Sequence, residues 1–446
     1  MKKFKRFITR KITYPLNLWH KGISKSDLDA FMGRDNWTHE KIKKLQAENL
    51  REFCRYAYQH CHYYQKVFDI YGINCDGDIF AEVHKLPSLK KEDIRQNLID
   101  LVSDEFVNRR GLITKATGGS TGSPMVVYGD SNDYRQNGLT IARQRRWIGW
   151  EGGMEVLSLF GGFRDVPSVT NRFLKSILVN DTVINIMDKS KADYSSILKK
   201  LRENPPQVLI GYFSILKQVA YAAELEQQPV TGIGLAVACA EPIEDATRKH
   251  VEQWLGTKVY AQYGCRELGT LAQECRNQSG YHFAQDMVLC EILDDNGKPA
   301  EYGNLTITYM GNRVTPLIRY QIGDGASLDR SQCDCGLPYH RLKVIDGRVS
   351  SMIILSNGTK ITSMIFPHLL KDFSWIMEYQ VEQTTLDYIK IRVKRRKDTF
   401  SKESLEGLTA KLSGLLGSSV RVEWIFNEEF LQVPTGKHVY FISRLE

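Results

Sequence analysis

The pattern of apolar and polar residues divides the chain into a helical, an alternating and a strand-rich region. From residue 38 to about residue 107, apolar side chains recur every three to four positions, most clearly over Glu40–Tyr58, which predicts helices. Short β-rich runs then alternate with helical stretches up to about residue 262. This alternation is typical of a layered α/β domain with a largely parallel sheet.

The pattern changes twice more toward the C-terminus. Between Val288 and Leu328 the apolar runs are short and separated by turn residues, which predicts an antiparallel subdomain. After Asp346-Gly347-Arg348, short strands and two helices are expected. We therefore predict an α/β protein with a large N-terminal domain (residues 38–346) and a small, mobile α+β C-terminal domain (residues 347–446).

The surplus of positive charge is confined to the start of the chain. The 446 residues include 60 Lys and Arg against 52 Asp and Glu, a formal net charge of +8. Eight basic residues and no acidic one lie within residues 1–25, so the remainder is neutral. A neutral body excludes reading the surplus charge as a nucleic-acid footprint spread over the folded domains, and we expect no nucleic-acid partner. Arg143, Arg145 and Arg146 are interpreted as a solvated helix face, with an anion-binding role as the alternative.

Residues 1–37 are predicted to form a basic, amphipathic leader. Within residues 1–13, four apolar side chains share one helical stripe among Lys and Arg: Phe4, Phe7, Ile8 and Ile12. Such a helix can lie on an anionic membrane surface, and the alternative is a solvated or locally packed arm. No apolar run approaches the ~20 residues that span a bilayer. With nine scattered cysteines, we expect a cytoplasmic protein, at most peripheral to the inner face of the membrane.

The segment Thr117–Pro124 combines three glycines with four hydroxyl side chains. Bare amide groups and hydroxyls are donors for phosphate oxygens, although a mobile turn has the same composition. No Lys-Ser/Thr pair follows the last glycine, so the segment is not a Walker A loop. Strand-like residues on both sides predict that it caps a hairpin.

Five further motifs follow in a set order. They are Ala240-Glu241-Pro242, Tyr263–Gly269, Arg319–Asp324, Asp346-Gly347-Arg348 and Pro434-Thr435-Gly436-Lys437. With the glycine-rich loop, this order resembles the adenylate-forming superfamily, most closely its phenylacetate–CoA ligase-like branch, which includes the CapK type of capsule biosynthesis. The resemblance extends from about residue 40 to the C-terminus.

The resemblance implies the cofactors ATP, Mg²⁺ and coenzyme A, and it assigns roles to individual residues. Thr121, Glu267 and Lys437 would be catalytic, with Glu267 holding Mg²⁺ and Lys437 contacting the carboxylate and the α-phosphate. Tyr263 would pack on adenine, and Asp324 would accept hydrogen bonds from both ribose hydroxyls. The expected ATP-binding residues are Thr117, Gly118, Gly119, Ser120, Thr121, Gly122, Glu241, Tyr263, Gly264, Glu267, Arg319, Asp324 and Arg348; the two arginines would contact ribose or phosphate.

A Cys/His set predicts a second kind of site. Cys275, His282, Cys333 and Cys335 supply the four ligands of a tetrahedral zinc site, which would be structural because four protein ligands leave no open position. The Cys-x-Cys spacing is tighter than usual, so two unrelated loops with free thiols are the alternative. The phenylacetate–CoA ligase-like branch often has a comparable set, which favours zinc.

The implied reaction activates a small carboxylate as an acyl-adenylate and transfers the acyl group to coenzyme A. Ser350 and Ser351 stand where this branch usually has a pair of aspartates, one of them at the hinge, which leaves the acceptor open. One alternative is transfer to an amine of a sugar or amino acid during surface-polysaccharide synthesis. Another is a non-catalytic nucleotide-binding subunit of a membrane-associated assembly.

Overall fold

The protein is described here from a computed structural model. The described residues are 6–116, 125–160, 176–186, 194–243, 245–348, 352–363, 365–370, 373, 375–396, 399–417, 419–431 and 439–445. Within these ranges, no helix is long and apolar enough to cross a bilayer.

Helices dominate the first hundred residues, as the apolar period predicts. They are η1 (Thr9–Thr13), α2 (Tyr14–His20), α3 (Lys25–Gly33), η2 (Arg34–Asn36), α4 (His39–His60), α5 (His62–Tyr71), α6 (Ile79–Lys85), α7 (Lys91–Gln96), α8 (Leu98–Leu101) and η3 (Asp104–Phe106). The long helix α4 starts at Thr38, whose hydroxyl accepts a hydrogen bond from the backbone N–H of Lys41. Its apolar stripe, which includes Ile42, Leu50 and Phe53, is buried.

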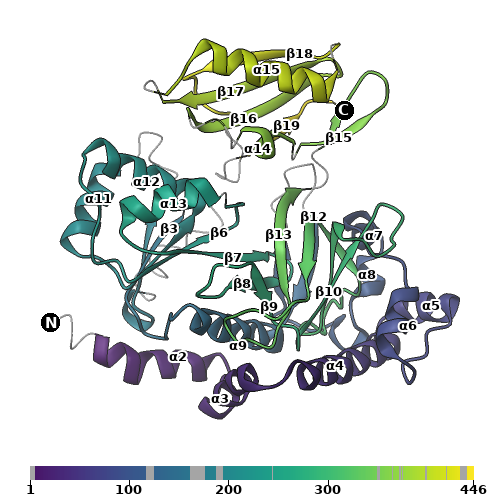
Figure 1. The fold of residues 1–446 in the computed structure, drawn as a ribbon. Coiled ribbons are helices and arrows are strands. Elements are labelled where there is room, and N and C mark those ends of the chain that lie inside the picture. The colour runs from purple at the N-terminus through teal and green to yellow at the C-terminus, as the bar shows by residue number, and fades with distance from the viewer. Residues whose placement is uncertain are drawn as a thin grey trace.

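One eleven-stranded sheet forms the centre of the N-terminal domain (Figure 1), in the order β10-β11-β12-β13-β9-β8-β7-β6-β5-β3-β4. The strands are β3 (Val156–Phe160), β4 (Asp181–Asn185), β5 (Val208–Tyr212), β6 (Leu235–Cys239), β7 (Val259–Cys265), β8 (Gly269–Glu274), β9 (Tyr281–Phe283), β10 (Val288–Leu293), β11 (Tyr302–Tyr309), β12 (Tyr320–Asp329) and β13 (Arg341–Arg348). Pairing is parallel from β3 to β7 and antiparallel beyond β7. The predicted antiparallel subdomain is therefore continuous with the parallel sheet.

Alternate residues of the parallel strands enter two cores on opposite faces. Leu157 and Leu209 pack into the core that contains α11 (Tyr194–Glu203), α12 (Phe213–Leu225) and α13 (Asp245–Leu255). Val156 and Val208 enter the other core, together with residues that follow α9 (Ser131–Trp147). Because strand side chains alternate between faces, a parallel strand covered on both sides is apolar throughout.

The C-terminal domain has its own sheet and core. Its elements are β14 (Met352–Ile354), β15 (Lys360–Thr362), α14 (Ile365–Leu370), β16 (Ile376–Thr385), β17 (Tyr388–Arg395), α15 (Lys402–Leu416), β18 (Arg421–Phe426) and β19 (Phe441–Ser443). Four of these strands form one sheet, in the order β18-β17-β16-β19. The core includes Trp375, Val381 and Leu412 and is separate from those of the N-terminal domain. Figure 1 shows this domain above the N-terminal domain, over the helices α12 and α13 and the upper end of β13.

The predicted leader of residues 1–37 divides in two. Ile23 and Phe31 are buried in the main core of the N-terminal domain, so the second part of the leader belongs to that domain. Residues 6–22 form the rest of the described leader and contain η1 and α2. We call residues 6–22 the N-terminal arm.

Candidate active site and metal cluster

The glycine-rich loop is carried by the predicted hairpin. β1 (Ile113–Ala116) and β2 (Val126–Gly129) pair antiparallel, whereas Thr117–Pro124 itself lies outside the described residues. At the base of the hairpin, Lys115 Nζ lies 2.5 Å from the buried Asp133 Oδ2 and 3.5 Å from the carbonyl oxygen of Glu267. The loop therefore begins beside the turn that carries Glu267.

Glu267 lies in the turn between β7 and β8. Its side chain is almost fully buried, and its Oε1 accepts a hydrogen bond of 2.7 Å from the Tyr320 hydroxyl. Burial and the charge of Glu267 raise the pKa of Tyr320, so the phenol stays protonated as a donor. Oε2 makes no hydrogen bond to any described residue, which leaves an oxygen that fits a hard cation such as Mg²⁺.

Two other predicted residues meet beside this turn. The Tyr263 hydroxyl donates a hydrogen bond of 2.6 Å to Asp324 Oδ2, which joins the end of β7 to β12. Burial first, and then the charge of Asp324, raise the pKa of Tyr263. Arg348 is the register partner of Asp324 on β13. The structure therefore brings together Tyr263, Glu267 and Asp324 from two motifs that lie far apart in the sequence.

Sequence reasoning missed two residues of this site. Tyr320 holds Glu267, and a Cβ added at Gly323 would lie 3.7 Å from Lys91 Nζ, at the start of α7. Lys91 thus brings a positive charge to the part of β12 that presents Asp324. Tyr320 lies inside the Arg319–Asp324 motif, and this position could have identified it as a site residue. No local pattern distinguishes Lys91 from other helical lysines.

The predicted contact of Arg319 with ribose or phosphate is wrong. Arg319 is 4% exposed, and its Nε and Nη2 bind the two carboxylate oxygens of Glu291 at 3.2 and 2.9 Å. Its Nη1 donates to the carbonyl oxygens of His84 and Leu86. A guanidinium that is buried and paired in this way fixes the β12 strand to the helical region, and four of its five N–H groups already have protein acceptors.

Two other predicted nucleotide-binding residues have structural roles. Glu241 accepts hydrogen bonds from Ser214 N at 2.6 Å and from Ser214 Oγ at 2.9 Å, so it caps α12. A Cβ at Gly264 would lie 2.4 Å from the carbonyl oxygen of Gly269, so only glycine permits the close approach of β7 and β8. Their nucleotide contacts stay predictions. Lys437 lies outside the described residues, as do Ser350 and Ser351.

The four predicted metal ligands converge. The ligand atoms of Cys275, His282, Cys333 and Cys335 all lie within 4.8 Å of one another. Cys275 Sγ is 3.9 Å from Cys333 Sγ, and Cys335 Sγ is 3.3 Å from His282 Nε2. A zinc tetrahedron with bonds of about 2.3 Å to sulfur and about 2.0 Å to nitrogen has edges of similar length. The set therefore fits a four-coordinate zinc ion.

The surroundings of the cluster also suit a cation. His282 Nδ1 lies 2.9 Å from the carbonyl oxygen of Tyr339, which leaves Nε2 directed at the thiols. The hydrogen bond from Cys335 lowers the pKa of Cys275 to about 3, and the same contact raises the pKa of Cys335. Thiols that crowd one another in this way are stabilised as thiolates by a bound cation.

The expectation of a solvated face at Arg143, Arg145 and Arg146 is wrong for Arg143. This residue is fully buried, and its Nη1 and Nη2 bind the carboxylate of Asp286 at 2.9 and 2.6 Å. The pairing joins α9 to the segment before β10, a structural role that leaves no exposed anion site at Arg143.

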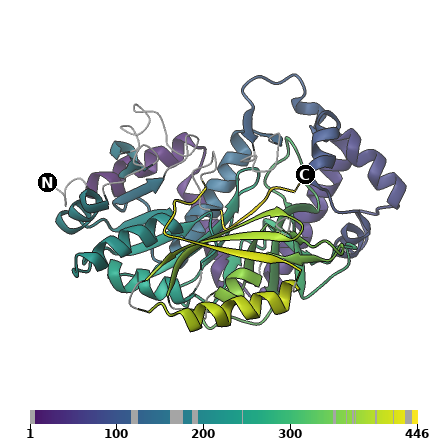
Figure 2. The ribbon, with the colours of Figure 1, turned by 90° about the horizontal axis from the view of Figure 1, so that it is seen from above.

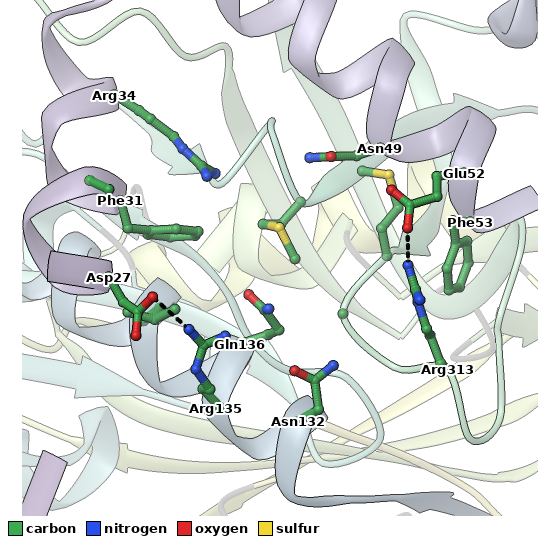
Figure 3. Close-up of a pocket in the computed structure, with 15 residues that line it drawn as sticks. Asp27, Phe31, Arg34, Asn49, Glu52, Phe53, Asn132, Arg135, Gln136 and Arg313 are labelled. Carbon is green, nitrogen blue, oxygen red and sulfur yellow. Dashed lines mark hydrogen bonds and ion pairs between the residues drawn. The ribbon is translucent and has the colours of Figure 1, made fainter. Parts of the chain in front are cut away.

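A separate pocket of about 450 Å³ lies among α3, α4 and α9 (Figure 3), and none of the predicted site residues lines it. Figure 3 shows the ion pairs Asp27–Arg135 and Glu52–Arg313 across its wall. Because its charged side chains already pair with one another, we assign it no part in catalysis.

A buried ion pair connects the two domains. Lys217 Nζ on α12 lies 3.1 Å from Glu378 Oε1 on β16, and the two side chains are only 4% and 5% exposed. Lys394 Nζ approaches the other oxygen, Glu378 Oε2, at 3.2 Å, and Tyr221 Oη donates to the carbonyl oxygen of Met377 at 3.5 Å. Seen from above, the C-terminal sheet lies across the helical layer that contains α12 (Figure 2). We call Lys217, Glu378 and Lys394 the interdomain ion cluster.

With this geometry established, known proteins can be compared. No family model matches the chain. Phenylacetate–coenzyme A ligase from Thermus thermophilus is 26% identical over 368 residues, which cover 79% of this chain and 81% of that protein. Protein CapK from Staphylococcus aureus is 23% identical over 424 residues, which cover 90% of this chain and 89% of that protein. The chain is a relative of the phenylacetate–CoA ligases and of CapK. The resemblance inferred from the ordered motifs is confirmed.

Solved structures share the fold. 2-Hydroxyisobutyryl-CoA ligase in its postadenylation state superposes with a TM-score of 0.73 at 18% identity, over 92% of this chain and 91% of that one. The same ligase in its thioesterification state gives 0.60 over the same shares of the two chains. The amide bond synthetase McbA from Marinactinospora thermotolerans gives 0.52 at 15% identity, over 73% and 68%. These comparisons show that the chain shares the fold of these ligases.

Proposed function

We propose that the chain joins a small carboxylate to coenzyme A through an acyl-adenylate. A carboxylate oxygen attacks the α-phosphorus of ATP, and the bond to pyrophosphate breaks. The thiol sulfur of coenzyme A then attacks the acyl carbon, and AMP leaves. The observation that carries the proposal is the meeting of Tyr263, Glu267 and Asp324 in a relative of the phenylacetate–CoA ligases.

Each described site residue has a role that suits this reaction. Glu267 would hold Mg²⁺, which would supply positive charge to offset the negative charge of the phosphates. Asp324 would accept hydrogen bonds from the ribose hydroxyls, with Tyr263 fixing the carboxylate from the side. The glycine-rich loop and Lys437 would complete the site from the β1–β2 hairpin and the C-terminal domain.

We further propose that the Cys/His cluster holds structural zinc. We also propose that the protein works in the cytoplasm, where its nine free cysteines stay reduced.

An amine acceptor is the second candidate. Ser350 and Ser351 replace an aspartate pair of the coenzyme A-dependent relatives, and a solved amide bond synthetase shares the fold. In this version a nitrogen of a sugar or amino acid attacks the acyl-adenylate in place of the thiol. An amine acceptor of this kind would place the reaction in surface-polysaccharide synthesis.

The test separates the two half-reactions. Pure protein with ATP, Mg²⁺ and a panel of carboxylates is expected to release carboxylate-dependent pyrophosphate, and hydroxylamine should trap the activated acyl group. Coenzyme A and amines are then compared as acceptors with the best acid. ATP binding without pyrophosphate release from any acid would contradict the proposal and favour a non-catalytic nucleotide-binding subunit.

Asp324→Ala is expected to raise the KM for ATP by about tenfold to a hundredfold, since hydrogen bonds to a carboxylate are worth ~1.5–3 kcal/mol. The wild-type protein should prefer ATP over 2′-deoxy-ATP, and the variant should lose that preference. Initial rates with both nucleotides measure this difference. Asp295→Ala, at an exposed turn, is the control. A variant that retains full discrimination would contradict the ribose assignment.

The interdomain ion cluster should favour the first half-reaction. Glu378→Ala leaves Lys217 buried without its partner, which costs about 3–5 kcal/mol in the described arrangement. We expect the rate of adenylate formation, measured by trapping, to fall by tenfold or more. The rate at which coenzyme A consumes a supplied acyl-adenylate should fall much less. Rapid-quench assays of the two steps give both rates, and Glu406→Ala on the exposed face of α15 is the control. Equal effects on both steps would contradict a positioning role.

A further inference from the structure

The N-terminal arm is attached to the protein by its cationic side. Arg6 Nη2 lies 2.9 Å from Glu155 Oε2, and Arg10 forms an ion pair with Glu151. The ring of Tyr14 packs on Gly152, where an added Cβ would lie 1.9 Å from a ring carbon. These contacts fix which side of the arm faces the N-terminal domain.

The opposite side of the arm is apolar and exposed. Phe7, Ile12, Leu16 and Trp19 are 58%, 49%, 57% and 75% exposed. Ile12, Leu16 and Trp19 follow the i, i+4, i+7 spacing of one helical face, whereas Phe7 lies three positions before Arg10, at the border of the cationic side. A surface helix of a globular protein normally turns its apolar stripe inward, so this arm is inverted. We call Ile12, Leu16 and Trp19, together with the exposed Phe7, the arm face.

We propose that the arm face docks on an anionic membrane surface. Residues 6–22 carry four Lys and Arg and no acidic side chain, so the arm stays positively charged through Lys11 and Lys21 after Glu155 and Glu151 neutralise the two arginines. Cations flanking an apolar stripe with a tryptophan suit the boundary between lipid headgroups and acyl chains. A second copy of the same arm would meet it with like charge, which disfavours self-association.

Docking of this kind is compatible with the proposed reaction and independent of it. Figure 1 places α2 on the far side of the N-terminal domain from the C-terminal domain. A lipid-bound arm therefore leaves the domain interface accessible. The arm would bring the acyl-transfer site near acceptors that are themselves held at the membrane.

Vesicle co-sedimentation tests the proposal with the full-length protein. We expect binding to phosphatidylcholine vesicles containing roughly 30% phosphatidylserine, weak binding to phosphatidylcholine alone, and release by salt. Leu16→Ser with Trp19→Ser should weaken binding to the anionic vesicles by about tenfold or more, because two apolar anchors are lost. Leu225→Ser, which is 86% exposed on α12, is the matched control and should bind like the wild type.

Two further readouts keep the test decisive. Equal melting temperatures of the variants would show that weaker binding is not caused by unfolding, and a Phe7→Ser, Ile12→Ser variant should repeat the effect. The proposal is overturned if the wild type does not bind anionic vesicles, or if both arm variants bind as well as the control. It is also overturned if light scattering shows a dimer that the arm substitutions dissociate.

Discussion

Glu267→Gln is expected to lower carboxylate-dependent pyrophosphate release by about a hundredfold, the scale seen when one electrostatic contact to a reacting centre is removed. The amide oxygen of Gln can still accept the hydrogen bond from Tyr320, so the turn between β7 and β8 should keep its shape. What is lost is the negative charge that would hold Mg²⁺. The measurement is the initial rate as a function of Mg²⁺ concentration, where the variant should need much more metal for half-maximal activity.

Glu291→Gln is the matched control for this prediction. Glu291 is also a buried carboxylate, but both its oxygens bind Arg319, so its loss should affect stability and leave the Mg²⁺ requirement unchanged. Breaking a buried pair costs about 3–5 kcal/mol, which thermal unfolding will detect. If Glu267→Gln lowers the melting temperature like Glu291→Gln and leaves the metal dependence unaltered, then Glu267 is structural.

The alternation of β-rich runs with helices was sufficient to predict the layered domain. The runs at 155–160, 207–210, 234–239 and 258–262 become β3, β5, β6 and β7 within one or two residues at most bounds. These strands are buried on both faces over most of their length, so each run is mainly apolar and stands out against its polar flanks. β4 was missed because all of its side chains are only partly buried. An edge strand of this kind carries a weaker apolar signal.

The two arginine errors have one physical cause. Arg319 and Arg143 are paired with Glu291 and Asp286, which lie 28 and 143 positions away in the sequence. A guanidinium is polar wherever it lies, and only the tertiary structure decides whether its partner is a carboxylate or a phosphate. Asp324 and Glu267 stay predictions; they could be singled out because the flanking glycines and tyrosines form part of a recognisable order.

Strand register, and not local sequence spacing, brings the two parts of the Cys/His cluster together. His282 on β9 is the register partner of both Gln273 on β8 and Arg341 on β13, so one short strand lies between the two segments that carry the cysteines. The sequence provides the ligand types, but the fifty residues between His282 and Cys333 say nothing about their distance. That distance is set by the sheet.

Cys333→Ser with Cys335→Ser is expected to abolish zinc binding and to lower the melting temperature by about 10 °C or more. Structural zinc contributes many kcal/mol to small domains, and each kcal/mol shifts the melting temperature by roughly 2–4 °C in a domain of this size class. The cluster joins the end of β8, β9 and the loop before β13, so its loss should loosen the middle of the sheet, next to the point where parallel strands give way to antiparallel ones. Mass spectrometry of the native wild-type protein should find one zinc ion per chain, and a strong chelator should reproduce the loss of stability.

Cys75→Ser is the control for this pair, because Cys75 is a partly buried thiol outside the cluster, and it should keep both the metal and the melting temperature. Adenylation at low temperature should survive in the double variant, since four protein ligands leave the ion no open position for a substrate. Wild-type protein that contains no zinc and is unaffected by chelators would contradict the site. Loss of adenylation from a folded double variant would instead place the metal in the reaction.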